Sequence, residues 1–234
     1  MTKKELAAKI DHTFLKAAGG PDAVKDLCRE AAEYGFACAM VNPAEVKNAA
    51  KFLKGKNVRV GTVVGFPLGQ ATAKMKVLEA QEAIKNGARD VDFVVNVRLL
   101  KAAAHEDAKA LAALEDELEA CASVKTCAEG VVAKLILECC YLLDEEKVLG
   151  CALAKASGFD FVKTSTGFGT PGAGVPSGAT VRDVALMRKV VGPNMGVKAA
   201  GGIRDLATAL AMIEAGADRL GCSAGVEIVS GLGE

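Results

Sequence analysis

Two lysines, each followed closely by a glycine-rich segment, are the residues of this sequence best suited to covalent chemistry. The first is Lys163 in the segment Phe159-Asp160-Phe161-Val162-Lys163-Thr164. The alternation of a strand puts Phe159, Phe161 and Lys163 on one face. Burial disfavours a charged amine, and a neutral amine is the form that attacks a carbonyl carbon. From this segment alone, a lysine that extends into solvent at the strand end is an equally good interpretation.

Lys198 in Gly196-Val197-Lys198-Ala199-Ala200-Gly201-Gly202 favours the catalytic interpretation. Strand alternation places it at the same level as Lys163 on the next expected strand. Two ammonium groups close together in a shielded site repel each other, which lowers the pKa of one of them. The pair therefore predicts Lys163 as a nucleophile that forms a Schiff base, with Lys198 as its neighbouring cation.

A carboxylate is expected from the segment Asp90-Val91-Asp92-Phe93-Val94-Val95-Asn96. Asp92 lies within an apolar run, on the same face as Val94 and Asn96. Inside a protein it needs a cation or hydrogen bonds, and the two lysines would supply the cation. A purely structural ion pair is the alternative, and it does not exclude catalysis. Asp90 is expected in the preceding turn, in contact with solvent.

These residues require a scaffold that brings several strand ends together. Short β-rich runs alternate with longer amphipathic runs along the chain, which indicates a parallel sheet with helical crossovers. The expected strands are Lys9–Phe14, Cys38–Val41, Val58–Val64, Val91–Asn96, Val131–Leu137, Phe159–Thr164, Gly196–Ala199 and Arg219–Gly221. The expected helices are Pro21–Tyr34, Ala44–Leu53, Thr72–Asn86, His105–Val124, Asp144–Ala156, Thr180–Val190 and Asp205–Glu214.

A closed barrel and an open doubly wound sheet both fit this alternation. No G-x-G-x-x-G follows the first strand, which disfavours the dinucleotide-binding form of the open sheet. A similar short motif with a glycine ends three of the expected helices, and we expect each glycine to be a helix C-cap. These glycines are Gly35, Gly87 and Gly216. Repetition of one unit favours the barrel. We predict an α/β fold, a single (β/α)₈ TIM barrel with a short N-terminal helical extension, forming one domain over residues 1–234.

Glycine-rich turns follow the last three expected strands and predict a phosphate site. Gly201 and Gly202 follow the seventh strand, and Ser223 lies in Gly221-Cys222-Ser223-Ala224-Gly225 after the eighth. Gly167 and Gly169 after the sixth strand extend this set. Backbone N–H groups of such turns often hold a phosphate in barrels of this class. Tight turns without a ligand are the alternative.

Composition narrows the function classes. Lys and Arg total 29 and Asp and Glu total 29, which gives no broad attraction to nucleic acid or an anionic membrane. The eight cysteines form no C-x-x-C pair, and His12 and His105 lack the spacing of metal ligands, so we expect neither a metal nor another cofactor. With no expected signal peptide or spanning segment, we predict a cytoplasmic location.

Several motifs together resemble the deoxyribose-phosphate aldolase family. They are Ile10-Asp11-His12-Thr13, Val41-Asn42-Pro43, Val63-Val64-Gly65-Phe66-Pro67-Leu68-Gly69, Phe161–Phe168 and Gly196–Arg204, and they span nearly the whole chain in family order. The resemblance implies a class I aldolase that cleaves 2-deoxy-D-ribose 5-phosphate into acetaldehyde and D-glyceraldehyde 3-phosphate, commonly as a homo-oligomer (dimer or tetramer). The partners it implies are small phosphorylated sugar and aldehyde substrates.

The resemblance also assigns roles to single residues. It implies that Lys163 forms the Schiff base, Lys198 tunes it and Asp92 relays protons. It further implies that Gly201, Gly202 and Ser223 hold the phosphate, that Lys134 at the opening of the fifth strand lines the pocket, and that Thr164 and Thr166 supply pocket hydroxyls. Gly167 belongs to the same set. Met40, Cys139, Ala224 and the long segment Thr170–Gly178 depart from the family pattern.

Two other functions remain open at this point. A phosphosugar isomerase on the same barrel would use Asp92 and Asp11 as acid and base without a covalent bond. A barrel without activity would bind a phosphorylated sugar and act through a partner. The lysine pair favours the aldolase over both. For His12 and Asp11 we expect structural roles, as an anchor of the first strand and as a buried hydrogen-bond acceptor.

Overall fold

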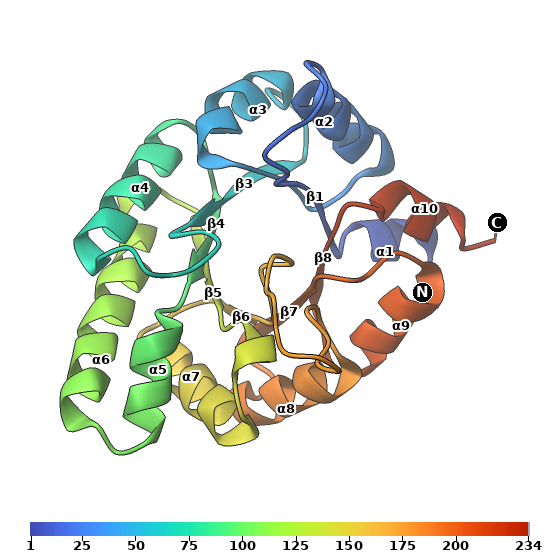
Figure 1. Ribbon diagram of the computed structural model, residues 1–234. Helices are drawn as coiled ribbons and strands as arrows, with labels where there is room; N and C mark the ends of the chain where they lie inside the picture. The colour runs from blue at the N-terminus through green and yellow to red at the C-terminus, as the bar shows by residue number, and fades with distance from the viewer. Residues whose placement is uncertain (234) are drawn as a thin grey trace.

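Eight parallel strands close into a barrel in the computed structural model, which describes residues 1–233 (Figure 1). The strands follow one another around the barrel in chain order, and β8 pairs with β1. This arrangement confirms the predicted TIM barrel and excludes the open sheet. The predicted domain end at Glu234 lies outside the described residues. The strands are β1 (Ile10–Phe14), β2 (Cys38–Val41), β3 (Arg59–Val64), β4 (Asp90–Val94), β5 (Val132–Ile136), β6 (Phe161–Lys163), β7 (Gly196–Ala200) and β8 (Arg219–Cys222).

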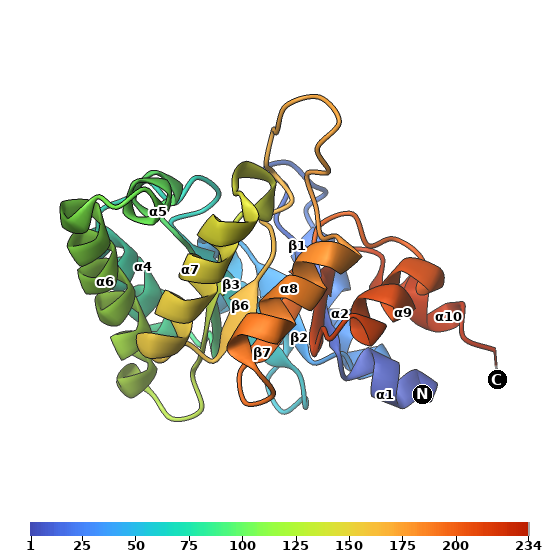
Figure 2. The ribbon, with the colours of Figure 1, turned by 90° about the horizontal axis from the view of Figure 1, so that it is seen from below.

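Helices form a ring around the strands, as both ribbon views show (Figures 1 and 2). The short first helix, α1, is capped by Thr2 and matches the predicted N-terminal extension. The helices are α1 (Lys3–Ala7), α2 (Ala23–Tyr34), α3 (Val46–Phe52), α4 (Ala73–Lys85), α5 (Val97–Ala104), α6 (Ala108–Ala122), α7 (Asp144–Ala156), α8 (Val181–Val191), α9 (Leu206–Glu214) and α10 (Gly225–Ser230), with 3-10 turns η1 (Pro43–Glu45), η2 (Ser123–Cys127) and η3 (Cys139–Tyr141).

The region after β4 differs from the sequence prediction. A strand was expected to Asn96 and a single helix over His105–Val124, whereas two helices, α5 and α6, occupy this region. The side chain of Asn96 accepts a hydrogen bond from the backbone N–H of Leu99, so this residue caps α5 instead of continuing the strand. Asp107 caps α6 in the same way. Asparagine and aspartate before an apolar run were the missed signals. The short α10 was also not predicted.

Two local predictions about strands and caps were wrong in part. Phe159 precedes β6 and packs against Phe93 on the helix side of the sheet, with ring centroids 5.9 Å apart, so it does not share the face of Lys163. Of the three expected glycine caps, Gly35 caps its helix with φ 71°, in the left-handed region. Gly87 and Gly216 lie one residue beyond the cap, at φ 116° and 111°.

The strands separate an apolar layer from a charged interior. Strand residues that face the helices, such as Val91, Val162 and Val197, belong to the large apolar core. Residues that alternate with them face inward, and many are charged, including the fully buried Asp90, Asp92 and Lys134. Burial of charge is costly without compensation, so this interior requires paired ions.

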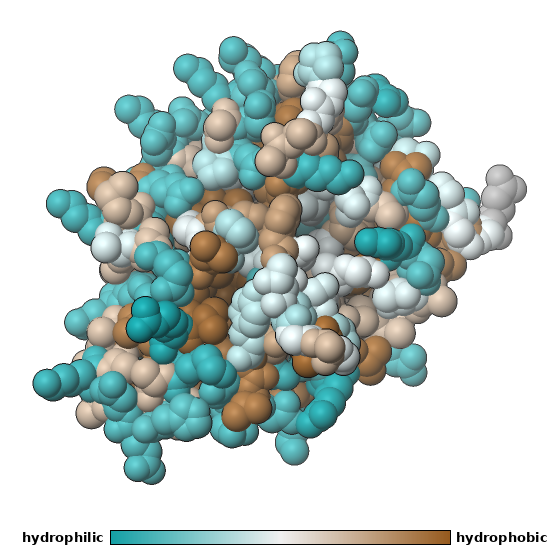
Figure 3. Space-filling model, in the orientation of Figure 1, coloured by the Kyte–Doolittle hydropathy of each residue, from teal (hydrophilic) through white to brown (hydrophobic). Residues whose placement is uncertain are grey.

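One end of the barrel carries the loops that follow the strands. The segment between β6 and α8 rises from this end in Figure 2, and it lies over the middle of the barrel in Figure 1. On the same face, hydrophilic residues surround the rim and apolar residues gather toward the middle (Figure 3). Within residues 1–233, no helix has the length and apolar character needed to cross a membrane.

Candidate active site

Lys163, Lys198 and Asp92 meet inside the barrel, although they come from β6, β7 and β4. Lys163 Nζ lies 2.9 Å from Asp92 Oδ2, and Lys198 Nζ lies 2.8 Å from the same oxygen. Parallel pairing sets Lys163 directly beside Lys198 in register, so the two amines point inward at one level. All three side chains are almost completely buried. The structure thus brings together the three residues that the sequence selected.

The surroundings of Lys163 favour its neutral form. Burial lowers the pKa of Lys163, Asp92 opposes that effect, and the charge of Lys198 lowers the pKa further, to about 8. Burial also acts on Lys198, but Asp11 and Asp92 outweigh it and raise the pKa of Lys198. The pKa values of the two adjacent lysines therefore differ, because Lys198 contacts a second carboxylate and Lys163 does not.

Asp11 is that second carboxylate. Its Oδ2 lies 2.5 Å from Lys198 Nζ, and its Oδ1 accepts a hydrogen bond from Arg219 at 2.7 Å. Burial would raise the pKa of Asp11, but Lys198, Lys134 and Arg219 lower it to about 2. The sequence argument expected a buried acceptor here, and its contact with Lys198 makes it a neighbour of the lysine pair.

Lys134 and Asp90 lie deeper in the barrel than predicted. Lys134 is the third residue of β5 and fully buried, with Nζ 2.8 Å from Asp90 Oδ1 and 3.0 Å from Asp92 Oδ1. It is absent from the described lining of the cavity that Lys163 borders, and its predicted role in the pocket stays a prediction. Asp90 begins β4 and is fully buried, which corrects the prediction of a solvated turn residue.

A cavity of about 560 Å³ opens above the lysine pair at the strand ends. Lys163 lies in its wall together with Thr166, which was expected as a pocket hydroxyl, and with four residues expected to hold the phosphate, namely Gly167, Gly201, Gly202 and Ser223. The three glycines have φ of 85°, 86° and 79°, a conformation that other residues rarely adopt. Their turns leave backbone groups accessible to a ligand in the cavity.

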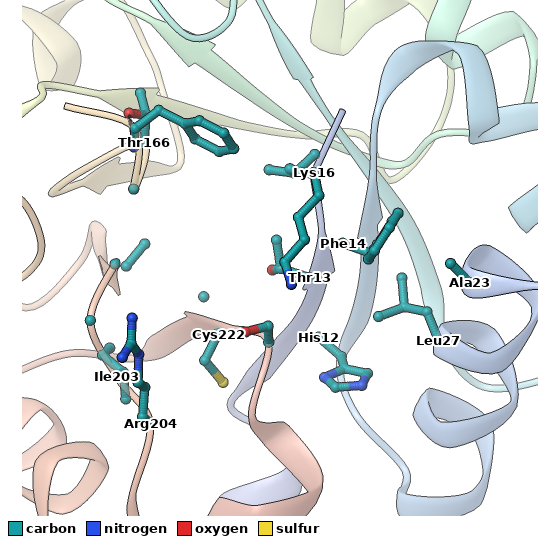
Figure 4. A pocket seen from close by; sticks show the side chains of 18 of the residues that line it. His12, Thr13, Phe14, Lys16, Ala23, Leu27, Thr166, Ile203, Arg204 and Cys222 are labelled. Atoms are coloured by element: carbon teal, nitrogen blue, oxygen red, sulfur yellow. Dashed lines mark hydrogen bonds between the residues drawn. The ribbon is translucent and has the colours of Figure 1, made fainter. Parts of the chain in front are cut away.

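Two exposed cations in this cavity were not selected from the sequence. Lys16 follows β1 and Arg204 follows β7, and Figure 4 shows them on facing sides of the cavity. The same lining also contains the carboxylates of Asp26 and Glu30, so the cavity presents both signs of charge. The positions of the two cations just beyond strand ends were the available signal.

The family model for the DeoC/LacD family of aldolases matches residues 6–231 of this chain. A deoxyribose-phosphate aldolase from Bacteroides thetaiotaomicron is 51% identical over 229 residues, covering 98% of this chain and 91% of the relative. One from Thermococcus kodakarensis is 51% identical over 234 residues, covering 99% and 98%. The solved tetrameric deoxyribose phosphate aldolase from Aeropyrum pernix superposes with a TM-score of 0.84 at 32% identity, covering 98% of this chain and 91% of that one.

This chain belongs to the DeoC/LacD aldolase family. The resemblance seen in the sequence motifs is thereby confirmed, and the chain is an enzyme of the lyase class.

The two threonines after Lys163 have different environments in this family member. Thr164 is fully buried and its hydroxyl is bonded to the backbone of Ala200, as a donor to the carbonyl at 3.2 Å and an acceptor from the N–H at 3.0 Å. Its hydroxyl thus joins β6 to β7, and its predicted role as a pocket hydroxyl stays a prediction. Thr166 does line the cavity.

Glu138 is a buried acid near this site that the sequence argument did not select. It follows β5 with φ 57° and ψ 63°, a conformation that non-glycine residues adopt at a cost. Its carboxylate accepts hydrogen bonds from the backbone N–H and the hydroxyl of Thr166. Burial raises the pKa of Glu138, against the hydrogen bonds from Thr166 and the charge of Lys163. Glu138 thus holds the loop that follows the lysine.

Proposed function

We propose that this family member is a class I aldolase that reversibly cleaves 2-deoxy-D-ribose 5-phosphate, with Lys163 forming the Schiff base. The observation that carries the proposal is the sharing of one oxygen, Asp92 Oδ2, by Lys163 and Lys198 at the base of the cavity. That arrangement gives a reactive amine, a second cation and a proton acceptor within one cluster. The names of the relatives at about half identity support the same substrate.

Covalent catalysis would begin with the neutral amine of Lys163. Nζ adds to the C1 aldehyde of the open-chain sugar, and loss of water gives a protonated imine. Asp92, through a water and with Lys198, takes the proton of the C3 hydroxyl. The C2–C3 bond then breaks, its electron pair passes into the imine, and D-glyceraldehyde 3-phosphate leaves. Protonation of the resulting enamine at C2 and hydrolysis release acetaldehyde and restore Lys163.

Phosphate recognition would anchor the other end of the substrate. The cavity is lined by the glycine turns and Ser223, that is, by Gly167, Gly201, Gly202 and Ser223. Two cations, Lys16 and Arg204, line the same cavity. Backbone N–H groups and cations together suit a phosphate dianion. Binding energy from the phosphate holds C1 against Lys163, which makes the first step effectively intramolecular.

Three further properties concern the organisation of the protein and its location. We propose one catalytic domain over the chain, a cytoplasmic location and a homo-oligomeric assembly. The tetramer described for the relative from Aeropyrum pernix supports the assembly. Sedimentation at several protein concentrations measures it directly, and a monomer at all concentrations would contradict it.

Borohydride reduction in the presence of 2-deoxyribose 5-phosphate tests the proposed reaction. Reduction converts an imine into a stable secondary amine, so peptide mass spectrometry should find an adduct on the peptide that contains Lys163. The variant Lys163→Met should show neither adduct nor turnover. A folded wild-type protein that turns over the sugar phosphate without any adduct would favour a non-covalent isomerase instead.

A further inference from the structure

Ionisable side chains from all eight strands point into the barrel, and the proposed reaction uses three of them. The remaining ones lie beneath the site, toward the amino ends of the strands. They are Asp11 on β1, Cys38 on β2, Arg59 on β3, Asp90 on β4, Lys134 on β5 and Arg219 on β8. The three that the reaction uses are Asp92, Lys163 and Lys198. Glu138, which follows β5, also faces Lys163. A set this large calls for a role beyond packing, because apolar side chains would fill the same space at lower cost.

Two arginines enter this set from the end of the barrel opposite the cavity. Arg59 is the first residue of β3 and Arg219 is the first residue of β8. Their side chains are 36% and 17% exposed, and neither is among the described residues that line the main cavity. A substrate in the cavity therefore meets neither arginine directly.

Arg219 is joined to the lysine pair through one carboxylate. Its Nη1 lies 2.7 Å from Asp11 Oδ1, and Asp11 Oδ2 lies 2.5 Å from Lys198 Nζ. Lys198 in turn lies 2.8 Å from Asp92 Oδ2, the oxygen that it shares with Lys163. The guanidinium also lies 5.8 Å from the ring centroid of Phe161, which fixes it further. Every contact in the series from Arg219 through Asp11, Lys198 and Asp92 to Lys163 joins opposite charges.

Arg59 is linked to the other oxygen of Asp92, Oδ1, by the same number of contacts. Its Nε lies 2.6 Å from Asp90 Oδ2, and Asp90 Oδ1 lies 2.8 Å from Lys134 Nζ. Lys134 then lies 3.0 Å from Asp92 Oδ1. Both arginines are thus linked to Asp92, each through one aspartate and one lysine. Arg59 is more exposed, so solvent screens its charge more strongly.

The charges in the barrel explain why one lysine should lose its proton. Lys134, Lys163 and Lys198 would be balanced by Asp11, Asp90 and Asp92 if no other charge were present. The two arginines add positive charge that cannot be removed at physiological pH, and an ionised Glu138 offsets only one unit of it. The least paired lysine then relieves the excess by releasing its proton, and Lys163 has one aspartate contact whereas Lys198 and Lys134 each have more.

We propose that Arg219, assisted by Arg59, is a positioning residue that favours the neutral form of the Lys163 amine from the opposite end of the barrel. Arg219 does this in two ways: it adds positive charge, and it occupies Asp11 Oδ1, so that Asp11 offsets less of the charge of Lys198. Without it, the charge excess falls and Asp92 interacts more strongly with Lys163. The catalytic consequence rests on the proposed function, because a neutral Lys163 matters only if it attacks a carbonyl.

Competitive labelling of the amine of Lys163 tests the proposal without substrate. The whole chain is treated with acetic anhydride at a series of pH values, and peptide mass spectrometry follows acetylation of Lys163, which requires the neutral amine. Arg219→Met should move the labelling midpoint upward by roughly one pH unit. Arg59→Met should move it in the same direction by less. Arg219→Lys keeps the charge and should stay close to the wild type.

Activity should follow the labelling. For Arg219→Met, kcat/KM near neutral pH should fall about tenfold and recover as the pH rises through the new midpoint. The matched control is Arg182→Met, because Arg182 is 80% exposed and pairs with Asp144 on the surface. It should change neither the midpoint nor the rate.

Several results would overturn the inference. The first is a labelling midpoint of Lys163 that is unchanged or lowered in both folded variants, Arg219→Met and Arg59→Met. The second is a shift of the labelling midpoint in Arg219→Lys as large as the shift in Arg219→Met. Circular dichroism establishes folding, and Arg219→Gln and Arg59→Met decide the matter if Arg219→Met does not fold. A shifted midpoint without any borohydride adduct in the wild type would reject the proposed reaction but not the effect on Lys163. A borohydride adduct in the wild type with unshifted labelling midpoints in the variants would support the proposed reaction and reject the effect of the arginines on Lys163.

Discussion

Asp92 contacts three charged partners, and its two oxygens divide them. Oδ1 meets Lys134, whereas Oδ2 is shared by Lys163 and Lys198. Burial would raise the pKa of Asp92, but the three lysines hold it well below its ordinary value. An oxygen shared by two amines can take up a proton for a moment and pass it to a neighbour, and the low pKa then returns the carboxylate to its ionised form. This is the property that a proton relay beside an imine requires.

Replacement of Lys163 separates its reactivity from its effect on stability. Lys163→Met should abolish turnover and raise the free energy of unfolding at pH 7 by about 1–3 kcal/mol, because a buried and poorly paired charge is removed. The pKa of Lys163 falls from 10.5 to about 8 on folding, so the folded state is disfavoured most below pH 8. The gain over the wild type should therefore shrink as the pH rises from about 8 to 10.5. Urea unfolding of both proteins at pH 7 and at high pH measures the gain in stability and its decrease with pH. A variant less stable than the wild type at pH 7 would contradict the argument.

The connection between β6 and α8 supports the phosphate end of the site. It leaves Lys163, passes through Gly167 and returns at Gly178 to contact Gly201 of the next turn. A Cβ at Gly178 would lie 2.4 Å from the carbonyl oxygen of Gly201, which leaves no room for a side chain. The backbone N–H of Ala179 also donates to the carbonyls of Ala200 and Gly201 at 3.0 and 3.1 Å. The end of this long segment is thus packed against the glycine turn.

Substitution of Gly178 should weaken phosphate recognition more than chemistry. Gly178→Ala should push the segment away from Gly201 and raise KM for 2-deoxyribose 5-phosphate about tenfold, with little effect on kcat/KM for unphosphorylated 2-deoxyribose. Gly172→Ala in the same segment is the control, because no described residue lies within 4 Å of its Cβ position. Steady-state kinetics with both sugars gives the comparison. Equal losses for the two sugars in Gly178→Ala would mean that the contact supports the lysine site instead.

The whole barrel depends on charges that must remain paired. The usual barrel interior consists of branched apolar side chains, but here the lower layers contain aspartates, lysines and arginines from every side. Once one partner is neutralised, the other becomes a buried and uncompensated charge. The stability of the whole molecule is therefore linked to the ionisation of its interior carboxylates.

Acid should destabilise the protein in a definite pH range. The pKa of Asp11 falls from 3.8 to about 2 on folding, so its contribution is present above about pH 4 and is lost as the pH falls through 2. Asp11 alone should account for about 2 kcal/mol of this loss. Urea unfolding between pH 6 and pH 2 measures it, and Asp11→Asn should start from a lower stability and lose less. The same loss in both proteins would show that Asp11 is not a source of acid sensitivity.

The sequence by itself determined the barrel, the lysine pair and Asp92. Alternation along strands, helix lengths and glycine turns are local features, and they place Lys163, Lys198 and Asp92 at inward positions without knowledge of their neighbours. The tertiary structure decided which groups pair. Asp92 meets Lys163 across 71 residues of sequence and Lys198 across 106. Because barrel closure sets these distances, the burial of Asp90, the depth of Lys134, the inward reach of Arg219 and the inter-strand contact of Thr164 follow only from the folded molecule.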